Sequence, residues 1–168
     1  IDTLSTGPEI ALAIEKVEEL VEAGMPYEEI CKSITQYIKR TGLLFMLKSL
    51  KSLANNGRVS PIAAKLVGIV GIGVVGKASN EGTLEQMHKC RGERRALETI
   101  VTDLEAEGFR SGKISIGHCR NESAALQLKE LILSKFKNAM IEIHKLRGLC
   151  SFYAENGGVL VGFEKAPV

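Results

Sequence analysis

LANNGRVSPIAAKLVGI, residues 53–69, predicts a tight joint between two helices. Asn55-Asn56-Gly57 predicts the end of the first helix, because glycine, and to a lesser degree asparagine, tolerates the left-handed backbone conformation that ends helices. Ser60-Pro61 predicts the start of the second helix, with a hydroxyl at the N-cap followed by proline at the first helical position. Arg58 is therefore expected between two helix ends, with its backbone fixed from both sides.

The guanidinium of Arg58 is expected near the positive end of the second helix. Its planar, permanently charged fork suits a carboxylate, a phosphate, or a neighbouring side chain that orients such a group. The alternative is that Arg58 caps the carbonyls of the first helix or pairs with a surface acid. The joint alone leaves both interpretations open.

The composition excludes several classes of protein. The chain has 168 residues and a net charge of +2, with three Tyr, five Phe and no Trp. It is long enough to bury a sizeable core, and it lacks the basic stripe with interleaved aromatics of a dedicated nucleic-acid binder. No run reaches the roughly 18 apolar residues of a membrane span. The four cysteines form no CxxC pair, which favours reduced thiols and a cytoplasmic location.

The first residues suggest a fragment. Ile1-Asp2-Thr3-Leu4-Ser5 begins without Met or a signal-peptide pattern, and it is expected to be the end of a buried strand that runs into a loop. A buried strand needs partners, so the natural protein is expected to begin earlier.

Two amphipathic helices are predicted next. Thr6-Gly7-Pro8-Glu9 predicts a capping-box start for the first helix, and Pro26 opens the second. The side chains predicted to face inward recur at helical spacing: Ile10, Ile14, Val17 and Val21 in the first helix, and Ile30, Ile34 and Tyr37 in the second.

The rest of the chain predicts an α/β fold, with helices packed on a mixed β-sheet. Leu43–Leu47, LLFML, is a continuous apolar run typical of a buried strand. After the joint, the elements follow the order β-β-α-β-α-β-β, which is typical of helices covering a sheet. Strands are predicted at 73–79, 83–90, 113–119, 140–146 and 158–163, helices at 93–107 and after an Asn121 cap, and a loop around Tyr153.

The side chains alone favour a binding module over an enzyme. His88, His118 and His144 fall on different predicted strands without a neighbouring acid at ligand spacing, so they are interpreted as structural or surface histidines. Gly71-x-Gly73-x-x-Gly76 matches a dinucleotide fingerprint in letters but leads into a strand instead of a helix, which excludes that function. No metal site and no catalytic set of Ser-His-Asp, Cys-His or paired carboxylates stands out.

A basic cluster lies where a predicted strand passes into a helix. It comprises Lys89, Arg91, Arg94 and Arg95. Cations at the start of a helix oppose its dipole. The cluster is therefore either an anion-binding or partner-docking site, or an ordinary solvated face.

Taken together, four motifs resemble the DegV family of bacterial fatty-acid-binding proteins. They are Ile1-Asp2-Thr3-Leu4-Ser5, Asn56-Gly57-Arg58-Val59-Ser60, Lys89-Cys90-Arg91-Gly92 before Arg95-Ala96-Leu97, and Gly157-Gly158-Val159-Leu160-Val161-Gly162-Phe163. The resemblance implies the C-terminal domain of a two-domain DegV-like protein. It divides the chain into residues 1–60, the end of an N-terminal parallel-sheet domain with connecting helices, and residues 61–168, a C-terminal α/β domain.

The resemblance also implies a function. Family members bind a long-chain fatty acid in a tunnel between the domains and present its carboxylate to a separate ATP-dependent fatty acid kinase subunit. That kinase forms an acyl phosphate for phospholipid synthesis, so the binding protein needs no cofactor and performs no chemistry. Each buried methylene contributes roughly 0.8 kcal/mol, which accounts for tight binding of a long acyl chain.

The resemblance assigns roles residue by residue. Arg58 matches the family's joint arginine and is expected to steady the headgroup region, while Tyr153 stands where the family commonly has histidine in a His-Thr-Gly-Pro-Gly context. Candidate tunnel walls are Phe45, Leu47, Ile62 and Leu66, for each of which plain core is the alternative, and candidate kinase contacts are Lys89, Arg91 and Arg95. The alternative function is half of a phosphate- or nucleotide-binding α/β enzyme, in which Arg58 and the 89–95 cluster grip phosphate.

Overall fold

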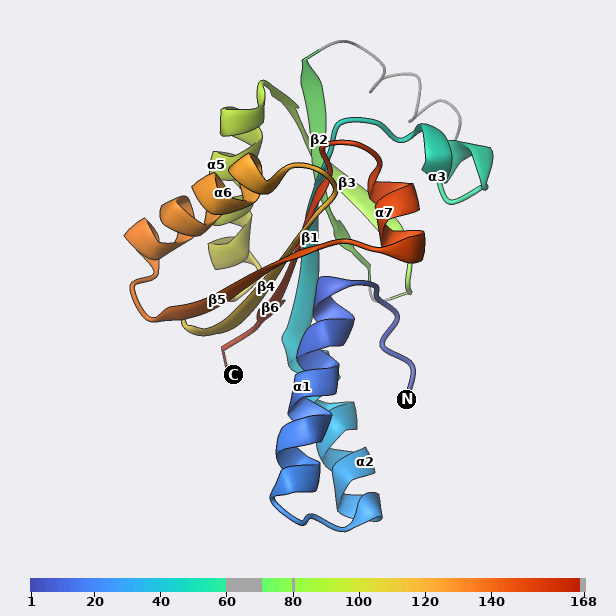
Figure 1. Ribbon diagram of the computed structural model, residues 1–168, viewed down its shortest axis with the longest axis vertical. Coiled ribbons are helices and arrows are strands. Elements are labelled where there is room, and N and C mark those ends of the chain that lie inside the picture. Colours follow the sequence, from blue (N-terminus) through green and yellow to red (C-terminus); the bar gives the residue numbers. More distant parts are fainter. Residues whose placement is uncertain (60–70, 80, 167–168) are drawn as a thin grey trace.

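The computed structural model describes residues 1–59, 71–79 and 81–166. Its strands and α-helices are labelled in Figure 1. The helices are α1 (Pro8–Glu22), α2 (Tyr27–Tyr37), the short 3-10 helix η1 (Ile38–Arg40), α3 (Lys51–Asn55), α5 (Glu93–Ala106), α6 (Glu122–Lys135) and α7 (Gly148–Ala154). The strands are β1 (Thr41–Leu47), β2 (Ile72–Ala78), β3 (Leu84–Arg91), β4 (Gly112–His118), β5 (Ala139–Lys145) and β6 (Val159–Glu164).

The strands form one six-stranded mixed sheet in the order β3-β2-β1-β6-β4-β5. Only β4 and β5 run parallel, and every other neighbouring pair is antiparallel. The predicted α/β class with a mixed sheet is therefore confirmed. Because β1 lies between β2 and β6, the described residues on either side of the expected division at residue 60 share this sheet.

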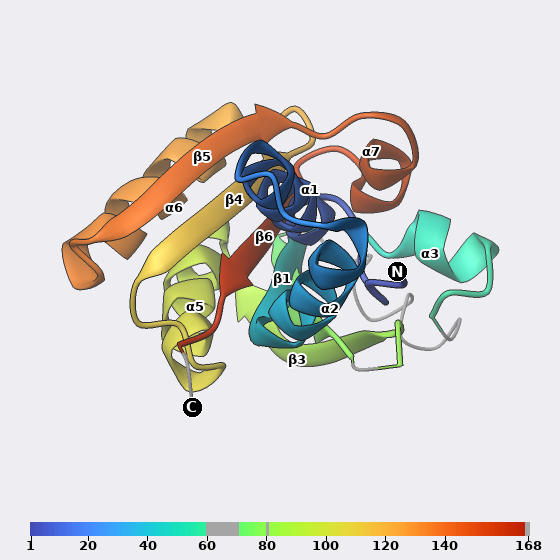
Figure 2. The same cartoon turned by 90° about the horizontal axis from the view of Figure 1, so that it is seen from below.

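One face of the sheet is covered by α5 and α6 (Figure 2). The side chains of Leu44 and Met46 point from β1 into this layer, together with Ile114 and Ile116 from β4. The inward residues predicted for α5 are confirmed, since Leu97, Ile100, Val101 and Leu104 are all buried. This layer forms the larger part of the hydrophobic core.

The opposite face carries α7, α3 and the first turn of α1 (Figure 2). Leu43, Phe45 and Leu47 alternate with the residues above and point to this side, where Leu53 of α3 and Ala154 of α7 pack near them. A strand buried on both faces needs apolar residues at successive positions, which explains the continuous LLFML run.

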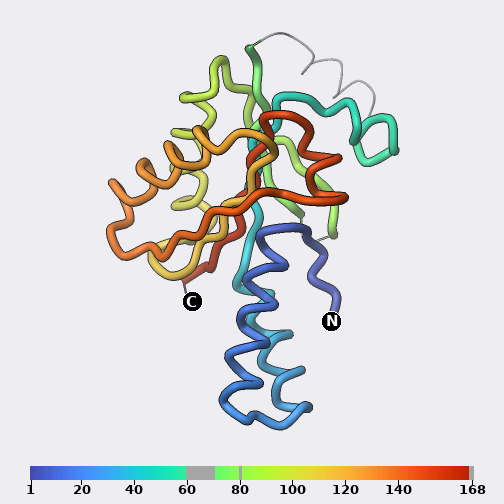
Figure 3. Tube along the Cα trace, viewed as in Figure 1, coloured from blue at the N-terminus to red at the C-terminus, as the bar shows by residue number. Residues whose placement is uncertain are grey.

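The helices α1 and α2 form a hairpin that extends away from the sheet (Figure 3). The hairpin begins on the sheet itself because Gly162 leaves room for it. A Cβ at Gly162 would lie 2.5 Å from the backbone nitrogen of Glu9, closer than such atoms approach in proteins. A glycine at this point in β6 therefore seats the start of α1.

The buried stripe predicted for α1 is wrong for Ile14 and Val21, whereas Val17 packs, partly buried, against the cluster between α1 and α2. Ile14 and Val21 are 54% and 58% exposed, whereas Leu12 and Leu20 are 1% and 9% exposed. The sequence of α1 has apolar residues on two stripes, and the helix turns the stripe with Leu12 and Ala13 toward α2. The stripe predicted for α2 is confirmed where Ile34 and Tyr37 are buried in the same cluster.

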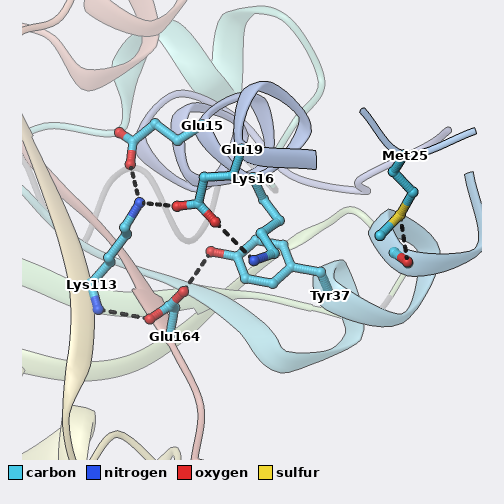
Figure 4. A network of polar contacts seen from close by, with 8 residues as sticks. Glu15, Lys16, Glu19, Met25, Tyr37, Lys113 and Glu164 are labelled. Carbon is cyan, nitrogen blue, oxygen red and sulfur yellow. Dashed lines mark hydrogen bonds and ion pairs between the residues drawn. The ribbon is translucent and has the colours of Figure 1, made fainter. Parts of the chain in front are cut away.

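Polar contacts join the base of this hairpin to the sheet (Figure 4). The hydroxyl of Tyr37 donates to Glu164 Oε1 at 2.8 Å, and the backbone N–H of Lys113 donates to Glu164 Oε2 at 2.8 Å. The ammonium of Lys113 lies 3.2 Å from Glu15 and 2.7 Å from Glu19. Hydrogen bonds from Lys113 and Lys16 lower the pKa of Glu19 from 4.5 to about 2.

Several local predictions need correction. Residues 1–5 form no strand: Leu4 N donates to Asp2 Oδ1 at 2.9 Å, and Leu4 has a φ of 50°, as in a turn. The N-cap of α1 is Gly7, which has no side chain, so the expected capping box does not form. Tyr153 lies in helix α7 instead of a loop.

The side chain of Asn121 also departs from its predicted role. Asn121 occupies the N-cap position of α6, but its amide donates to Glu93 Oε2 at 2.8 Å and to the carbonyl of Gly157 at 2.9 Å. The amide thus joins the starts of α5 and β6 instead of capping its own helix. All four cysteines are free thiols. None of the helices in the described ranges is long and apolar enough to cross a membrane.

Candidate functional site

A pocket of about 530 Å³ opens on the face of the sheet that carries α3 and α7. Its floor consists of alternate residues from the middle of the sheet: Leu43, Phe45 and Leu47 of β1, and Leu160 of β6. These four side chains share one face because Phe45 pairs directly with Leu160 and the side chains of a strand alternate in direction. The floor is therefore apolar and fixed by the sheet register.

The walls of the pocket come from four separate segments. Leu53 and the joint residues Gly57 and Arg58 follow one side, and the turn between β2 and β3 contributes Thr83, followed by Leu84 at the start of β3. Helix α7 supplies Leu149, Cys150, Tyr153 and Ala154, and the N-terminal segment supplies Asp2, Leu4, Ser5 and Thr6. An apolar cavity with a few polar groups at its edges is the usual form of a small-molecule site.

The predicted ligand-binding residues meet in this pocket. Arg58, Tyr153, Phe45 and Leu47 all line it, although they come from three elements that are distant in sequence. The backbone N–H of Arg58 donates to the carbonyl of Leu53 at 2.8 Å, which anchors the joint on the last turn of α3. The predicted wall residues Ile62 and Leu66, and the helix expected after Pro61, lie outside the described residues.

The N-terminal segment is the part of the site that sequence reasoning missed. The carboxylate of Glu9, which is buried, accepts hydrogen bonds from Ser5 Oγ and, at 2.6 Å, from Thr41 Oγ1. Thr6 Oγ1 lies 3.2 Å from Cys150 Sγ on α7. These contacts hold residues 2–6 against the pocket. Thr-x-x-Glu was interpretable as a local capping box, and nothing in the sequence indicates that Glu9 reaches a strand 32 residues onward.

A hydrogen bond to a carboxylate adds to the apolar packing that joins α3 to α7. Glu155, directly after α7, accepts a hydrogen bond from Ser52 N of α3 at 2.7 Å. Within α7, the rings of Phe152 and Tyr153 meet edge to face, with centroids 5.1 Å apart. The side chain of Phe152 is half exposed, so Tyr153 is the ring that faces the pocket.

The basic cluster divides between two elements. Lys89 and Arg91 are exposed on the edge strand β3, opposite Val74 and Ile72 of β2, so both point to the face that carries the pocket. Arg95 is exposed on α5, which covers the other face of the sheet. The structure therefore brings Lys89 and Arg91 together and sets Arg95 apart from them.

Two of the histidines, His88 and His118, have hydrogen-bond partners within the protein. His88, interpreted from the sequence as a structural or surface residue, has its Nε2 3.1 Å from Oδ1 of Asp103 on α5, a partner 15 residues away in the sequence. Burial raises the pKa of Asp103, and the neighbouring His88 opposes that shift. His118 Nδ1 accepts a hydrogen bond from Asn121 N at 3.2 Å. Within the described ranges, no three His, Cys, Asp or Glu side chains gather as metal ligands.

The comparisons with known proteins agree with this geometry. A family model described as "uncharacterised protein, DegV family" matches residues 1–166. A DegV domain-containing protein of Streptococcus pyogenes serotype M1 is 42% identical over 164 residues, which is 98% of this chain and 59% of the relative. This chain thus spans about three fifths of the length of such relatives.

Two solved structures are similar over nearly the whole chain. The Streptococcus pneumoniae Fatty Acid Kinase (Fak) B3 protein, loaded with linoleic acid, superposes with a TM-score of 0.96 at 41% identity, covering 99% of this chain and 59% of that one. A DegV family protein from Eubacterium eligens, loaded with heptadecanoic acid, gives a TM-score of 0.96 at 38% identity, with 99% and 60% covered. The sequence motifs, the sheet order and these matches agree, and the chain belongs to the DegV family.

Proposed function

We propose that the protein binds a long-chain fatty acid, with the hydrocarbon chain on the floor made by β1 and β6. The observation that carries this proposal is the apolar pocket of about 530 Å³ in a chain similar to two structures loaded with fatty acids. Each buried methylene contributes roughly 0.8 kcal/mol, so a sixteen-carbon chain gains on the order of 12 kcal/mol before the costs of binding. An apolar floor of this kind supplies affinity with little preference for a particular headgroup.

The polar groups at the edge of the pocket are proposed to hold the carboxylate end. Arg58 supplies a permanent positive charge, and Tyr153 supplies a neutral hydroxyl donor. Phe45 and Leu47 are proposed as walls for the acyl chain, and Ile62 and Leu66 remain proposals for the undescribed part of the chain. The relatives are longer than this chain, and the family places the tunnel between two domains. In that arrangement, the pocket would be one half of the tunnel.

We propose that the protein acts as a carrier and that catalysis belongs to a partner. The similar Fak B3 protein carries the name of a fatty acid kinase system. A cytoplasmic kinase subunit would dock on the exposed cations Lys89, Arg91 and Arg95 and phosphorylate the carboxylate with ATP. The product would be an acyl phosphate for phospholipid synthesis, and the carrier itself would need no cofactor.

The test is native mass spectrometry of the purified protein, followed by lipid analysis of its organic extract. A fatty acid near one-to-one occupancy would support the carrier function and identify the acyl chain. An empty protein that also fails to take up added fatty acid would contradict it. ATP binding by the protein alone would instead support the alternative, a phosphate- or nucleotide-binding enzyme.

The role of Arg58 has its own test. Arg58→Ala should weaken fatty-acid loading or lower the rate at which the kinase forms acyl phosphate, because the carboxylate would lose its positive partner. Wild-type behaviour in both assays would remove Arg58 from the site and leave the carrier function standing. Arg40→Ala, on η1 and away from the pocket lining, is the matched control.

A further inference from the structure

Glu155 connects α7, which carries Tyr153, to α3, which Arg58 follows in the sequence. Its Oε1 accepts a hydrogen bond from Ser52 N at 2.7 Å, across 103 residues of sequence. Ser52 lies in the first turn of α3, whose N-cap residue Leu50 provides no side-chain cap. A carboxylate bound to a free N–H at a helix start is a charge-assisted contact that the helix dipole favours. Glu155 thus supplies from α7 the cap that α3 lacks.

The residues on either side of the Glu155–Ser52 hydrogen bond are close in sequence to residues that line the pocket. Tyr153 lies two residues before Glu155 and lines the pocket from α7. Arg58 follows α3, and its backbone is hydrogen-bonded to Leu53 on the last turn of that helix. A shift of α3 against α7 would therefore change the position of the Arg58 guanidinium relative to the Tyr153 hydroxyl.

The backbone of Glu155 is held in a conformation that costs energy. Its φ is 53° and its ψ is −176°, close to a region of the backbone map that is essentially confined to glycine. Gly157 and Gly158 follow in the same turn, and at both positions an added Cβ would lie too close to neighbouring atoms. At Glu155 the side chain compensates for the strain through its contact with Ser52.

We infer that Glu155 is a positioning residue for the polar end of the pocket. By fixing α3 against α7, it sets the geometry in which Arg58 meets an ionised carboxylate. It thereby sets the preference of the pocket for a fatty acid over an uncharged molecule with the same chain. The inference rests on the proposed function of this pocket.

The test uses Glu155→Gly in the full-length protein, after any bound lipid has been removed. This variant removes the carboxylate and also relieves the backbone strain, so its melting temperature should stay near that of wild type. The dissociation constant for hexadecanoic acid should rise about five- to tenfold, because the Arg58 guanidinium would no longer be held where it meets the carboxylate. The dissociation constant for hexadecan-1-ol should change less than about twofold, because the apolar floor is intact.

Three further variants make the result specific. Glu155→Gln retains an acceptor oxygen and should recover most of the affinity for the acid. Arg120→Gly is the matched control: Arg120 also has a φ of 53° but lies away from this pocket, so its affinity for the acid should equal that of wild type. In an Arg58→Ala background, Glu155→Gly should have no additional effect, because Glu155 acts through Arg58.

The inference is overturned if Glu155→Gly binds the acid as tightly as wild type, or if acid and alcohol lose affinity equally, since that pattern is structural. It is also overturned if Glu155→Gly weakens acid binding further in the Arg58→Ala background. Failure of the wild-type protein to bind either compound would instead overturn the proposed function. Should the glycine variant fail to fold, Glu155→Gln decides: a loss of affinity for the acid that exceeds the loss for the alcohol supports the inference, and equal losses, or no loss for either compound, contradict it.

Discussion

The hydroxyl of Tyr37 donates a hydrogen bond to the carboxylate of Glu164 at 2.8 Å and so joins the end of α2 to the end of β6. Tyr37 is 6% exposed, and Glu164 Oε2 also accepts from the backbone of Lys113. Burial, together with this hydrogen bond to Glu164, raises the pKa of Tyr37 far above its usual value, so the phenol stays a donor at any pH of interest.

Tyr37→Phe should lower the free energy of unfolding by about 1–2 kcal/mol, because a hydrogen bond to a charged acceptor is lost without a cavity being formed. Urea unfolding monitored by circular dichroism measures the change. Tyr27→Phe is the control, since Tyr27 is 78% exposed and should leave the unfolding midpoint unchanged. Equal effects from the two substitutions would contradict the role given to Tyr37.

Glu19→Gln should change the response to acid. The pKa of Glu19 is held near 2 in the folded protein, below its usual 4.5, so its ion pairs stabilise the fold above about pH 5 and are lost as the pH falls toward 2. Because these ion pairs are partly exposed, the substitution should lower the free energy of unfolding at neutral pH by less than about 1 kcal/mol. The variant and wild type should converge near pH 2 in urea titrations. Glu18→Gln, on the exposed side of α1, is the control.

Gly162→Ala should destabilise the protein by about 1–3 kcal/mol, because the new methyl group would press on the backbone of Pro8 and Glu9 at the start of α1. Gly73→Ala is the matched control in the same sheet, where the nearest atom to an added Cβ lies 3.7 Å away. Thermal unfolding of both variants measures the difference. If Gly73→Ala lowered the stability as much as Gly162→Ala, the effect would come from backbone flexibility of strand glycines and not from contact with α1.

If the proposed kinase partner docks on this surface, reversing the charges of Lys89 and Arg91 together should slow acyl-phosphate formation and leave fatty-acid loading unchanged. Both side chains are exposed on the pocket side of β3, beyond the pocket itself. Exposed charges mainly affect association rates, so the defect should diminish at high salt. Lys32→Glu, on α2, is the control. Normal rates at low salt with the double reversal would exclude this surface as the docking site.

Much of the fold was predictable because its signals are local. LLFML is a short continuous apolar run between turn signals, and that local pattern is typical of a buried strand. The stripe of α1 was predicted wrongly because Leu12 and Ile14 belong to two apolar stripes of one helix. Which stripe is buried depends on where Gly162 seats the helix, and that is a tertiary contact.

The site was predictable only in part for the same reason. Arg58, Tyr153, Phe45 and Leu47 were identified from the joint and from the family resemblance, and the structure places all four around one pocket. The N-terminal wall was missed because the contacts of Glu9 with Ser5 and Thr41 are set by the packing of α1 on the sheet. The helix α7 was missed because seven residues without a capping side chain give a weak signal.

The central position of β1 has a consequence for synthesis of the chain. Its partner β6 is made more than a hundred residues later, since Thr41 pairs with Glu164. Pairings this distant in sequence form slowly, and an unpaired apolar strand edge invites association with other chains. On the ribosome, LLFML therefore stays open along one edge until residues 159–164 emerge. The pocket floor made by β1 and β6 therefore forms only once residues 159–164 are available, and until then the open edge of β1 favours association with chaperones or other chains.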